Sequence, residues 1–100
     1  MNRCTLEGRL SGAPEERTLP SGDCLVTFRV VVPRDGESRV DTIDCQVETA
    51  ALRRRLLRME DGTTLHVEGR LQRRFFRSAQ GPASRYEVRV DTVQRMPVAR

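Results

Sequence analysis

Apolar and polar residues alternate along five stretches of the chain, and a period of two residues is typical of half-buried β-strands. These stretches are residues 2–10, 24–33, 39–47, 63–76 and 85–95. In the first stretch, every second residue from Cys4 to Leu10 is apolar or glycine, and the residues between them are polar. The pattern therefore predicts five strands, each with one face on a shared core.

The alternation also predicts which side chains point into that core. On the four later strands these are Val26, Phe28, Val30, Val32, Ile43, Cys45, Val47, Leu65, Val67, Gly69, Leu71, Tyr86, Val88 and Val90. If the pattern continues past Leu71, Phe75 shares the inward face, whereas Arg74 and Phe76 point outward. Past the rim of the barrel the strand can leave the core, and both phenylalanine rings are then exposed.

The period changes between the third and fourth strands. In residues 49–59, Leu52, Leu56 and Met59 recur at helical spacing, and arginines occupy most of the other side. This pattern predicts a short amphipathic helix that ends before Gly62.

Glycines and prolines mark the connections between the strands. Residues 11–23 form a loop with a short extended piece at residues 17–19. Residues 34–38 form a polar hairpin tip, and residues 78–84 form a flexible hairpin loop.

Three strands, one helix and two strands follow one another in the order of a five-stranded OB barrel, an all-β fold. Two nearly identical phrases, L-E-G-R-L at residues 6–10 and V-E-G-R-L at residues 67–71, each place a glycine in mid-strand. A glycine at such a position often marks a bend at a barrel corner. Since 100 residues bury only one modest core, we expect a single OB-fold domain over residues 1–100.

The charge is unevenly distributed. Eighteen basic residues, all arginine, face fourteen acidic ones, which gives a net charge of +4. The stretch R-L-Q-R-R-F-F-R at residues 70–77 contains four arginines, two phenylalanines and no acid, so the whole excess can be assigned to it. Arginine pairs with phosphate and stacks on flat rings, but a genome rich in guanine and cytosine explains the absence of lysine equally well.

Several classes of protein are disfavoured. No apolar run approaches the roughly 20 residues of a membrane helix, and the chain opens directly on its first strand rather than on a signal peptide. We therefore expect a soluble, cytoplasmic (nucleoid-associated) protein without a membrane partner.

The cysteines predict free thiols. Cys4, Cys24 and Cys45 make an odd count, and together with His66 they lack the close Cys-x2-4-Cys pairing of zinc sites. No metal and no cofactor is expected. A disulfide between the Cys4 residues of two subunits stays open as an alternative.

An enzymatic function is disfavoured as well, and no catalytic residue is assigned. His66 has no serine or cysteine partner at a recognisable spacing. Asp41 and Asp44 are three residues apart on a strand, so they face opposite sides and do not converge on one ion. The glycines are dispersed and form no phosphate-binding loop.

Binding of a single-stranded nucleic acid fits the residues better, because such binders combine a basic groove with rings on which bases stack. Phe75, Phe76 and the adjacent Arg77 supply both features, and Phe76 is the stronger stacking candidate. Further arginines expected to point away from the core, and able to follow one groove, are Arg29, Arg70 and Arg89. The competing interpretation is a solvated face whose arginines are balanced by Glu7, Glu68, Glu87 and Asp91.

The order and spacing of several motifs resemble the bacterial single-stranded DNA-binding protein family. The motifs are N-R-C-T-L-E-G-R-L, A-P-E-E-R, P-S-G-D, F-R-V-V-V, L-R-M-E-D-G and V-E-G-R-L-Q-R-R-F-F, spread between residues 2 and 76 of a resemblance that extends to about residue 96. The resemblance implies an OB fold, usually a homotetramer (a dimer being the alternative), that coats single-stranded DNA without strong sequence preference in replication, repair and recombination.

The resemblance also implies roles for particular residues. Phe76 matches a stacking aromatic of the family, and Arg74 matches a nearby basic contact. Arg3 matches a basic residue near the N-terminus, Arg17 one in the first loop, and Arg85 one at the last hairpin.

The sequence departs from the family late in the second strand and across the third, where residues 30–35 and 42–49 contain no aromatic residue. Asp44 and Glu48 stand near positions where basic or aromatic residues are usual. The sequence also ends at residues 97–100 without the family's acidic tip, so recruitment of proteins through a tail is not expected. Two alternatives therefore stay open: an OB module that binds proteins and barely touches DNA, and a protein that prefers RNA.

Overall fold

The computed structural model describes residues 1–97 and contains six strands and one helix in this range. They are β1 (Cys4–Leu10), β2 (Glu15–Thr18), β3 (Cys24–Pro33), β4 (Val40–Val47), α1 (Ala50–Leu57), β5 (Thr64–Ser78) and β6 (Gly81–Arg95). No helix within the described range is both long and apolar enough to cross a membrane. The chain end on which the expectation about an acidic tail rests includes residues 98–100, which lie outside the described residues.

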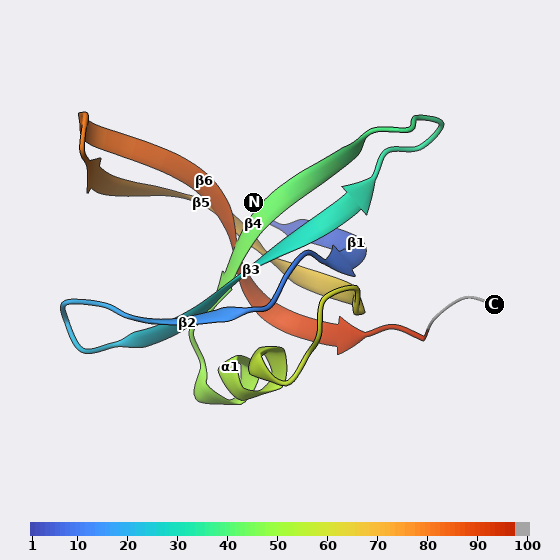
Figure 1. The fold of residues 1–100 in the computed structure, drawn as a ribbon, viewed down its shortest axis with the longest axis horizontal. Helices are drawn as coiled ribbons and strands as arrows, with labels where there is room; N and C mark the ends of the chain where they lie inside the picture. Colours follow the sequence, from blue (N-terminus) through green and yellow to red (C-terminus); the bar gives the residue numbers. More distant parts are fainter. Residues whose placement is uncertain (98–100) are drawn as a thin grey trace.

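Five of the strands close into a barrel (Figure 1). The strand order is β1-β5-β6-β4-β3-β2, and an additional pairing of β1 with β3 completes the ring. The other closing contact is a short parallel pairing of β4 with β6, in which Cys45 faces Val88. The predicted five-stranded OB barrel with one short helix before the last two strands is thereby confirmed. The short extended piece expected in the first loop is β2, an edge strand paired with β3.

Alternating side chains fill the barrel, as hydrophobic burial requires of strands with one face inside. The largest fully buried residues are Leu10, Leu56, Leu65, Val26, Val30, Val47, Val67, Val88 and Cys45. Val32 and Ile43 are partly buried and pack against this core. The helix α1 contributes Leu56, and the side chain of Thr49 accepts a hydrogen bond from Leu52 N at its first turn.

Two mid-strand glycines allow the barrel walls to approach one another. A Cβ atom on Gly8 would lie 2.1 Å from the carbonyl oxygen of Val31, and one on Gly69 would lie 2.1 Å from that of Arg89. The register shift at Glu68/Gly69 leaves Asp91 without a paired residue on β5. Because of this β-bulge, the inward face of β6 shifts by one residue after Val90. Val93, rather than Thr92, is therefore the next residue that packs in the core.

Beyond the barrel, β5 and β6 continue as a two-stranded ribbon, which we call the hairpin and define as residues 71–88. Its far end extends away from the rest of the chain in Figure 1. The expected loop at residues 78–84 is shorter than predicted, because β5 runs to Ser78 and β6 starts at Gly81.

The hairpin overturns two predictions about the core. Leu71 is 43% exposed and Tyr86 is 61% exposed, although the alternation placed both inside. Both residues lie on the face that is inward within the barrel, but Leu71 is at the rim of the core, opposite buried Val88, and Tyr86 lies beyond that rim. The alternation of apolar and polar residues predicts which face of a strand a residue lies on. It does not predict where along the strand the core ends.

We predict that Gly69→Ala lowers the free energy of unfolding by about 1–3 kcal/mol or more, because its Cβ meets backbone atoms that have no room to move. Urea denaturation measures the change. The exposed residue Gln94 provides a control, since Gln94→Ala removes only surface atoms of β6. An unchanged midpoint for Gly69→Ala would contradict the close approach of the two strands.

Candidate nucleic-acid interface

An open groove of about 350 Å³ crosses β3 and β4, between β2 on one side and the base of the hairpin on the other. This face and the two flanking loops are where OB folds bind oligonucleotides. Four arginines line the groove, Arg17, Arg29, Arg74 and Arg85, together with three acids, Glu15, Asp44 and Glu87. The sequence had predicted these arginines as contacts, and the fold brings all four together from β2, β3, β5 and β6.

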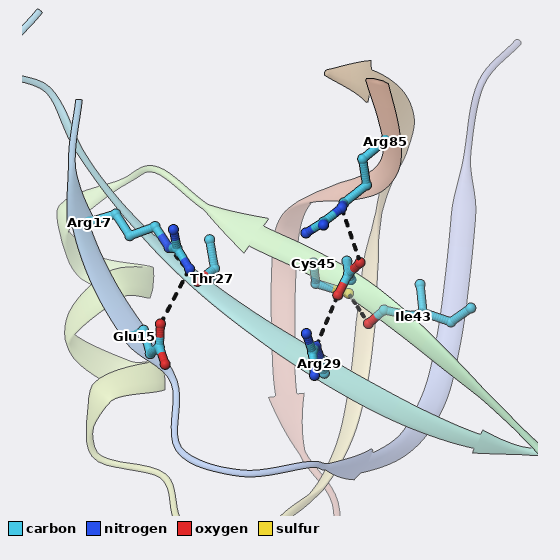
Figure 2. Close-up of polar contacts among 8 residues, drawn as sticks. Glu15, Arg17, Thr27, Arg29, Ile43, Cys45 and Arg85 are labelled. Carbon is cyan, nitrogen blue, oxygen red and sulfur yellow. Dashed lines mark hydrogen bonds and ion pairs between the residues drawn. The ribbon is translucent and has the colours of Figure 1, made fainter. Parts of the chain in front are cut away.

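Carboxylates partly neutralise these arginines. Figure 2 shows Arg29 and Arg85 reaching toward the same point from β3 and from the hairpin. Asp44 lies at that point, with one oxygen 3.2 Å from Arg29 Nε and the other 4.0 Å from Arg85 Nε. Arg17 pairs similarly with Glu15 at 3.4 Å, and its Nε donates a hydrogen bond to Thr27 Oγ1. Exposed ion pairs of this kind contribute only ~0–1 kcal/mol each, so a competing anion can replace the carboxylates.

Glu87 forms the floor of the groove beside the hairpin. Its side chain is only 4% exposed, which corrects the expectation that it belongs to a solvated face. Gln46 Nε2 and Gln72 Nε2 donate hydrogen bonds to its Oε1 atom at 3.2 and 3.4 Å, and Arg74 Nε lies 3.0 Å from the same oxygen. A buried carboxyl group needs such partners. Glu87 therefore holds Arg74 in place on the groove side of the hairpin.

Phe76 lies on the same side of the hairpin. Its ring is half-buried, and the guanidinium carbons of Arg74 and Arg85 lie 5.4 and 5.8 Å from the ring centroid. Arg74 and Arg85 face each other across the two strands. The groove side of the hairpin thus carries an aromatic ring near two cations that line the groove, which is the chemistry that a stacked base and its phosphates require.

The same arrangement of strands and helix occurs in known proteins. The chain matches the Single-strand binding protein family over residues 1–96. It belongs to this family.

Two curated relatives from this family give the degree of similarity. The chain is 36% identical over 86 residues to Single-stranded DNA-binding protein 1 of Staphylococcus aureus (strain COL), covering 81% of this chain and 52% of the relative. It is 34% identical over 86 residues to Single-stranded DNA-binding protein A of Bacillus subtilis (strain 168), covering 81% and 50%. The chain thus spans about half the length of these relatives.

A solved structure with the same fold is titled "Plasmodium falciparum SSB complex with ssDNA". It superposes with a TM-score of 0.72 at 21% identity and covers 89% of this chain and 85% of its own. At this identity the likeness concerns the fold.

Four of the predicted arginines lie outside the groove. Arg70 and Arg89 line a second, smaller groove of about 270 Å³ on β5 and β6, and Arg89 is paired with Glu48. Arg3 forms an ion pair with Asp91 at 3.0 Å, and its hydrogen bond holds the pKa of Asp91 below the usual value. The expectation that Arg29, Arg70 and Arg89 follow one groove is therefore wrong. The remaining two candidates, Phe75 and Arg77, lie on the opposite face of the hairpin.

Sequence reasoning missed the polar network under the groove. Gln46 and Glu87 are outward positions of β4 and β6, and the short parallel pairing of these strands brings them together. The sequence marks Asp44 as a rejected metal ligand and as an unusual acid for the family, whereas in the structure it contacts two groove arginines. The only signal in the sequence was polar residues at alternate positions of residues 42–46, and this signal does not reveal a partner on a distant strand.

Cys45 lies at the groove with its side chain in the core. Burial raises the pKa of its thiol to about 12. Its Sγ atom contacts the carbonyl oxygen of Ile43 at 3.7 Å (Figure 2). The thiolate is the reactive form of cysteine, so this residue is chemically inert at neutral pH.

We predict that in the native protein at about pH 8 the half-buried Cys4 and Cys24 react with a thiol reagent such as DTNB, whereas Cys45 reacts only after unfolding, because its thiolate fraction is negligible. Cys45→Ala should leave the reaction of the native protein unchanged and remove the thiol that reacts only after unfolding. Three thiols reacting at one rate would contradict the burial of Cys45.

Proposed function

We propose that this chain binds single-stranded DNA without strong sequence preference, in the groove across β3 and β4 and onto Phe76. The observation that carries the proposal is the half-buried Phe76 ring, which lies near Arg74 and Arg85, two of the four arginines that line the groove. Family membership, the printed names of the relatives and the single-stranded DNA in the solved complex support it.

Binding exchanges carboxylates for phosphates. Arg17, Arg29 and Arg85 release their exposed ion pairs and contact the backbone, while Arg74 stays fixed on buried Glu87. A base stacks on the accessible part of Phe76. Such contacts do not distinguish sequences, because every base has a flat face and every nucleotide has a phosphate.

Arg3, Arg70 and Arg89 belong to the proposal as outlying contacts. They lie beside or near the second groove, so they touch only a strand that continues around the barrel. By the same resemblance, the protein assembles as a homo-oligomer, a tetramer or a dimer, and acts in the cytoplasm on DNA exposed during replication, repair and recombination.

A second candidate function is an OB module that binds protein partners and has weak DNA affinity. It is favoured by Asp44, whose carboxylate engages two of the groove arginines, and by Glu48, which engages Arg89. RNA in place of DNA is a further alternative, and competition between RNA and DNA oligonucleotides of the same sequence separates the two.

We predict that fluorescently labelled oligo-dT binds the wild-type protein at low salt, with a log–log salt slope of about −0.7 per phosphate neutralised. Phe76→Ala should weaken binding by ~1–3 kcal/mol through the loss of stacking. Phe76→Leu separates the flat ring from mere apolar volume, and Leu57→Ala on the exposed side of α1 is the control. Absence of binding by the wild-type protein at low salt rules out the proposed function and leaves the protein-binding module.

We predict that Asp44→Asn tightens oligo-dT binding by roughly 1.5- to 5-fold, since it frees Arg29 and Arg85 from an exposed ion pair. Asp41→Asn is a matched control: it changes the overall charge equally on the same strand, but the arginine that loses its partner at position 41 is Arg34, which keeps its ion pair with Glu37 and lies outside the groove. Equal effects of the two substitutions would mean that only net charge matters.

A further inference from the structure

The hairpin has a second face, opposite the groove, which we call the outer face. The register of β5 and β6 places Arg73 opposite Tyr86, Phe75 opposite Ser84, and Arg77 opposite Pro82. Leu71 lies on the same face at the junction with the barrel. Since successive residues of a strand point to opposite sides, these residues do not share the groove side of the hairpin, on which Arg74 and Phe76 lie.

The outer face exposes unusually large apolar side chains. Phe75 is 73% exposed, which leaves most of its ring free of protein atoms, and Tyr86 is exposed beside it. The guanidinium carbon of Arg73 lies 5.1 Å from the Phe75 centroid and 5.5 Å from the Tyr86 centroid. Arg73 Nε also donates a hydrogen bond to Ser84 Oγ at 3.0 Å. Arg73 therefore lies near both rings and joins them in one cluster. Exposed apolar patches rimmed by polar groups mark binding surfaces.

The charge of the outer face is purely positive. None of the residues that β5 and β6 place there between Leu71 and Val88 is acidic. Over residues 1–97, no carboxylate oxygen lies within 4.0 Å of a side-chain nitrogen of Arg73 or Arg77. On the groove side, in contrast, both hairpin arginines have acidic partners. The outer face thus combines accessible rings with cations that have no competing internal anion.

We propose that the outer face is a second contact surface for single-stranded DNA, on which bases stack on Phe75 and Tyr86 while Arg73 and Arg77 bind phosphates. The proposal rests on the proposed function and extends it to the reverse of the hairpin. Only a two-stranded ribbon separates the two faces, so one DNA strand can pass over the open edge of the ribbon and contact both.

A second copy of the chain fits this surface less well. In a symmetric dimer, each subunit would present the same face, and the Arg73 and Arg77 of both copies would be brought together without a carboxylate. Single-stranded DNA fits better, because its phosphates pair with the arginines and its bases stack on the two rings.

The sequence provides a direct probe of the outer face, because Tyr86 is the only tyrosine and there is no tryptophan. The intrinsic emission of the protein therefore reports on this face alone, whereas the anisotropy of fluorescein-labelled oligo-dT reports binding anywhere. We expect oligo-dT to quench the Tyr86 emission in parallel with the anisotropy change, because a base stacked on the ring quenches it. Phe76→Leu changes only the groove side. When enough oligo-dT is added to saturate this variant, the Tyr86 emission should still be quenched.

Binding of the double variant Phe75→Ala/Tyr86→Ala provides the second measurement. Each lost stacking partner should weaken binding of a long oligo-dT by roughly 5- to 150-fold. Both rings are largely exposed, so the variant should keep the thermal midpoint of the parent.

Arg73→Gln/Arg77→Gln should flatten the salt dependence of oligo-dT binding more than Arg54→Gln/Arg55→Gln, which removes the same charge from exposed positions of α1.

The outcomes separate this inference from the proposed function. If labelled oligo-dT binds but Tyr86 emission is unchanged and Phe75→Ala/Tyr86→Ala binds like the parent, the inference is wrong and groove binding stands. If the wild-type protein shows no anisotropy change, both fail. If the double variant binds DNA like the parent but has a lower mass by light scattering, the outer face joins subunits and the inference is overturned.

Discussion

Antiparallel pairing of β5 with β6 continues beyond the point at which the barrel core ends, and the functional surfaces depend on this constraint. Inside the barrel, one face of each strand is covered by apolar residues such as Val67 and Val90. Val88 and Glu87 are still buried at the base of the hairpin, but beyond Gln72 no core covers either face, so the ribbon presents side chains on both sides. The two phenylalanines at positions 75 and 76 consequently face opposite directions, with Arg73 near the ring of Phe75 and Arg74 and Arg85 near that of Phe76.

Electrostatics then distinguish the two sides of the hairpin. On the groove side, Asp44 and Glu87 hold Arg29, Arg85 and Arg74 in position, which preorganises the cations but opposes an incoming phosphate. On the outer side, the described residues offer Arg73 and Arg77 no carboxylate partner. The groove thus supplies a shaped path at some electrostatic cost, and the outer face supplies unneutralised charge without a groove.

Sequence reasoning succeeded where local pattern determines structure. The period of two residues predicted the strands, Leu52 and Leu56 predicted the helix, and the order of the elements predicted the barrel. It failed where distant segments meet: the end of the core exposes Tyr86, and the parallel pairing of β4 with β6 buries Glu87 under Gln46. Arg70 and Arg89 line a different groove from Arg29, and no local pattern in the sequence reveals this separation.

The central claim is that the groove and the hairpin together form the surface on which single-stranded DNA lies. Amide chemical shifts of the ¹⁵N-labelled protein, followed during titration with oligo-dT, test it most directly, because they report contacts residue by residue. The account predicts shifts concentrated in residues 72–86 and on β3 and β4 around Arg29 and Asp44, with α1 and the exposed face of β1 unaffected. Shifts confined to β1 and α1, with the hairpin unchanged, would contradict it.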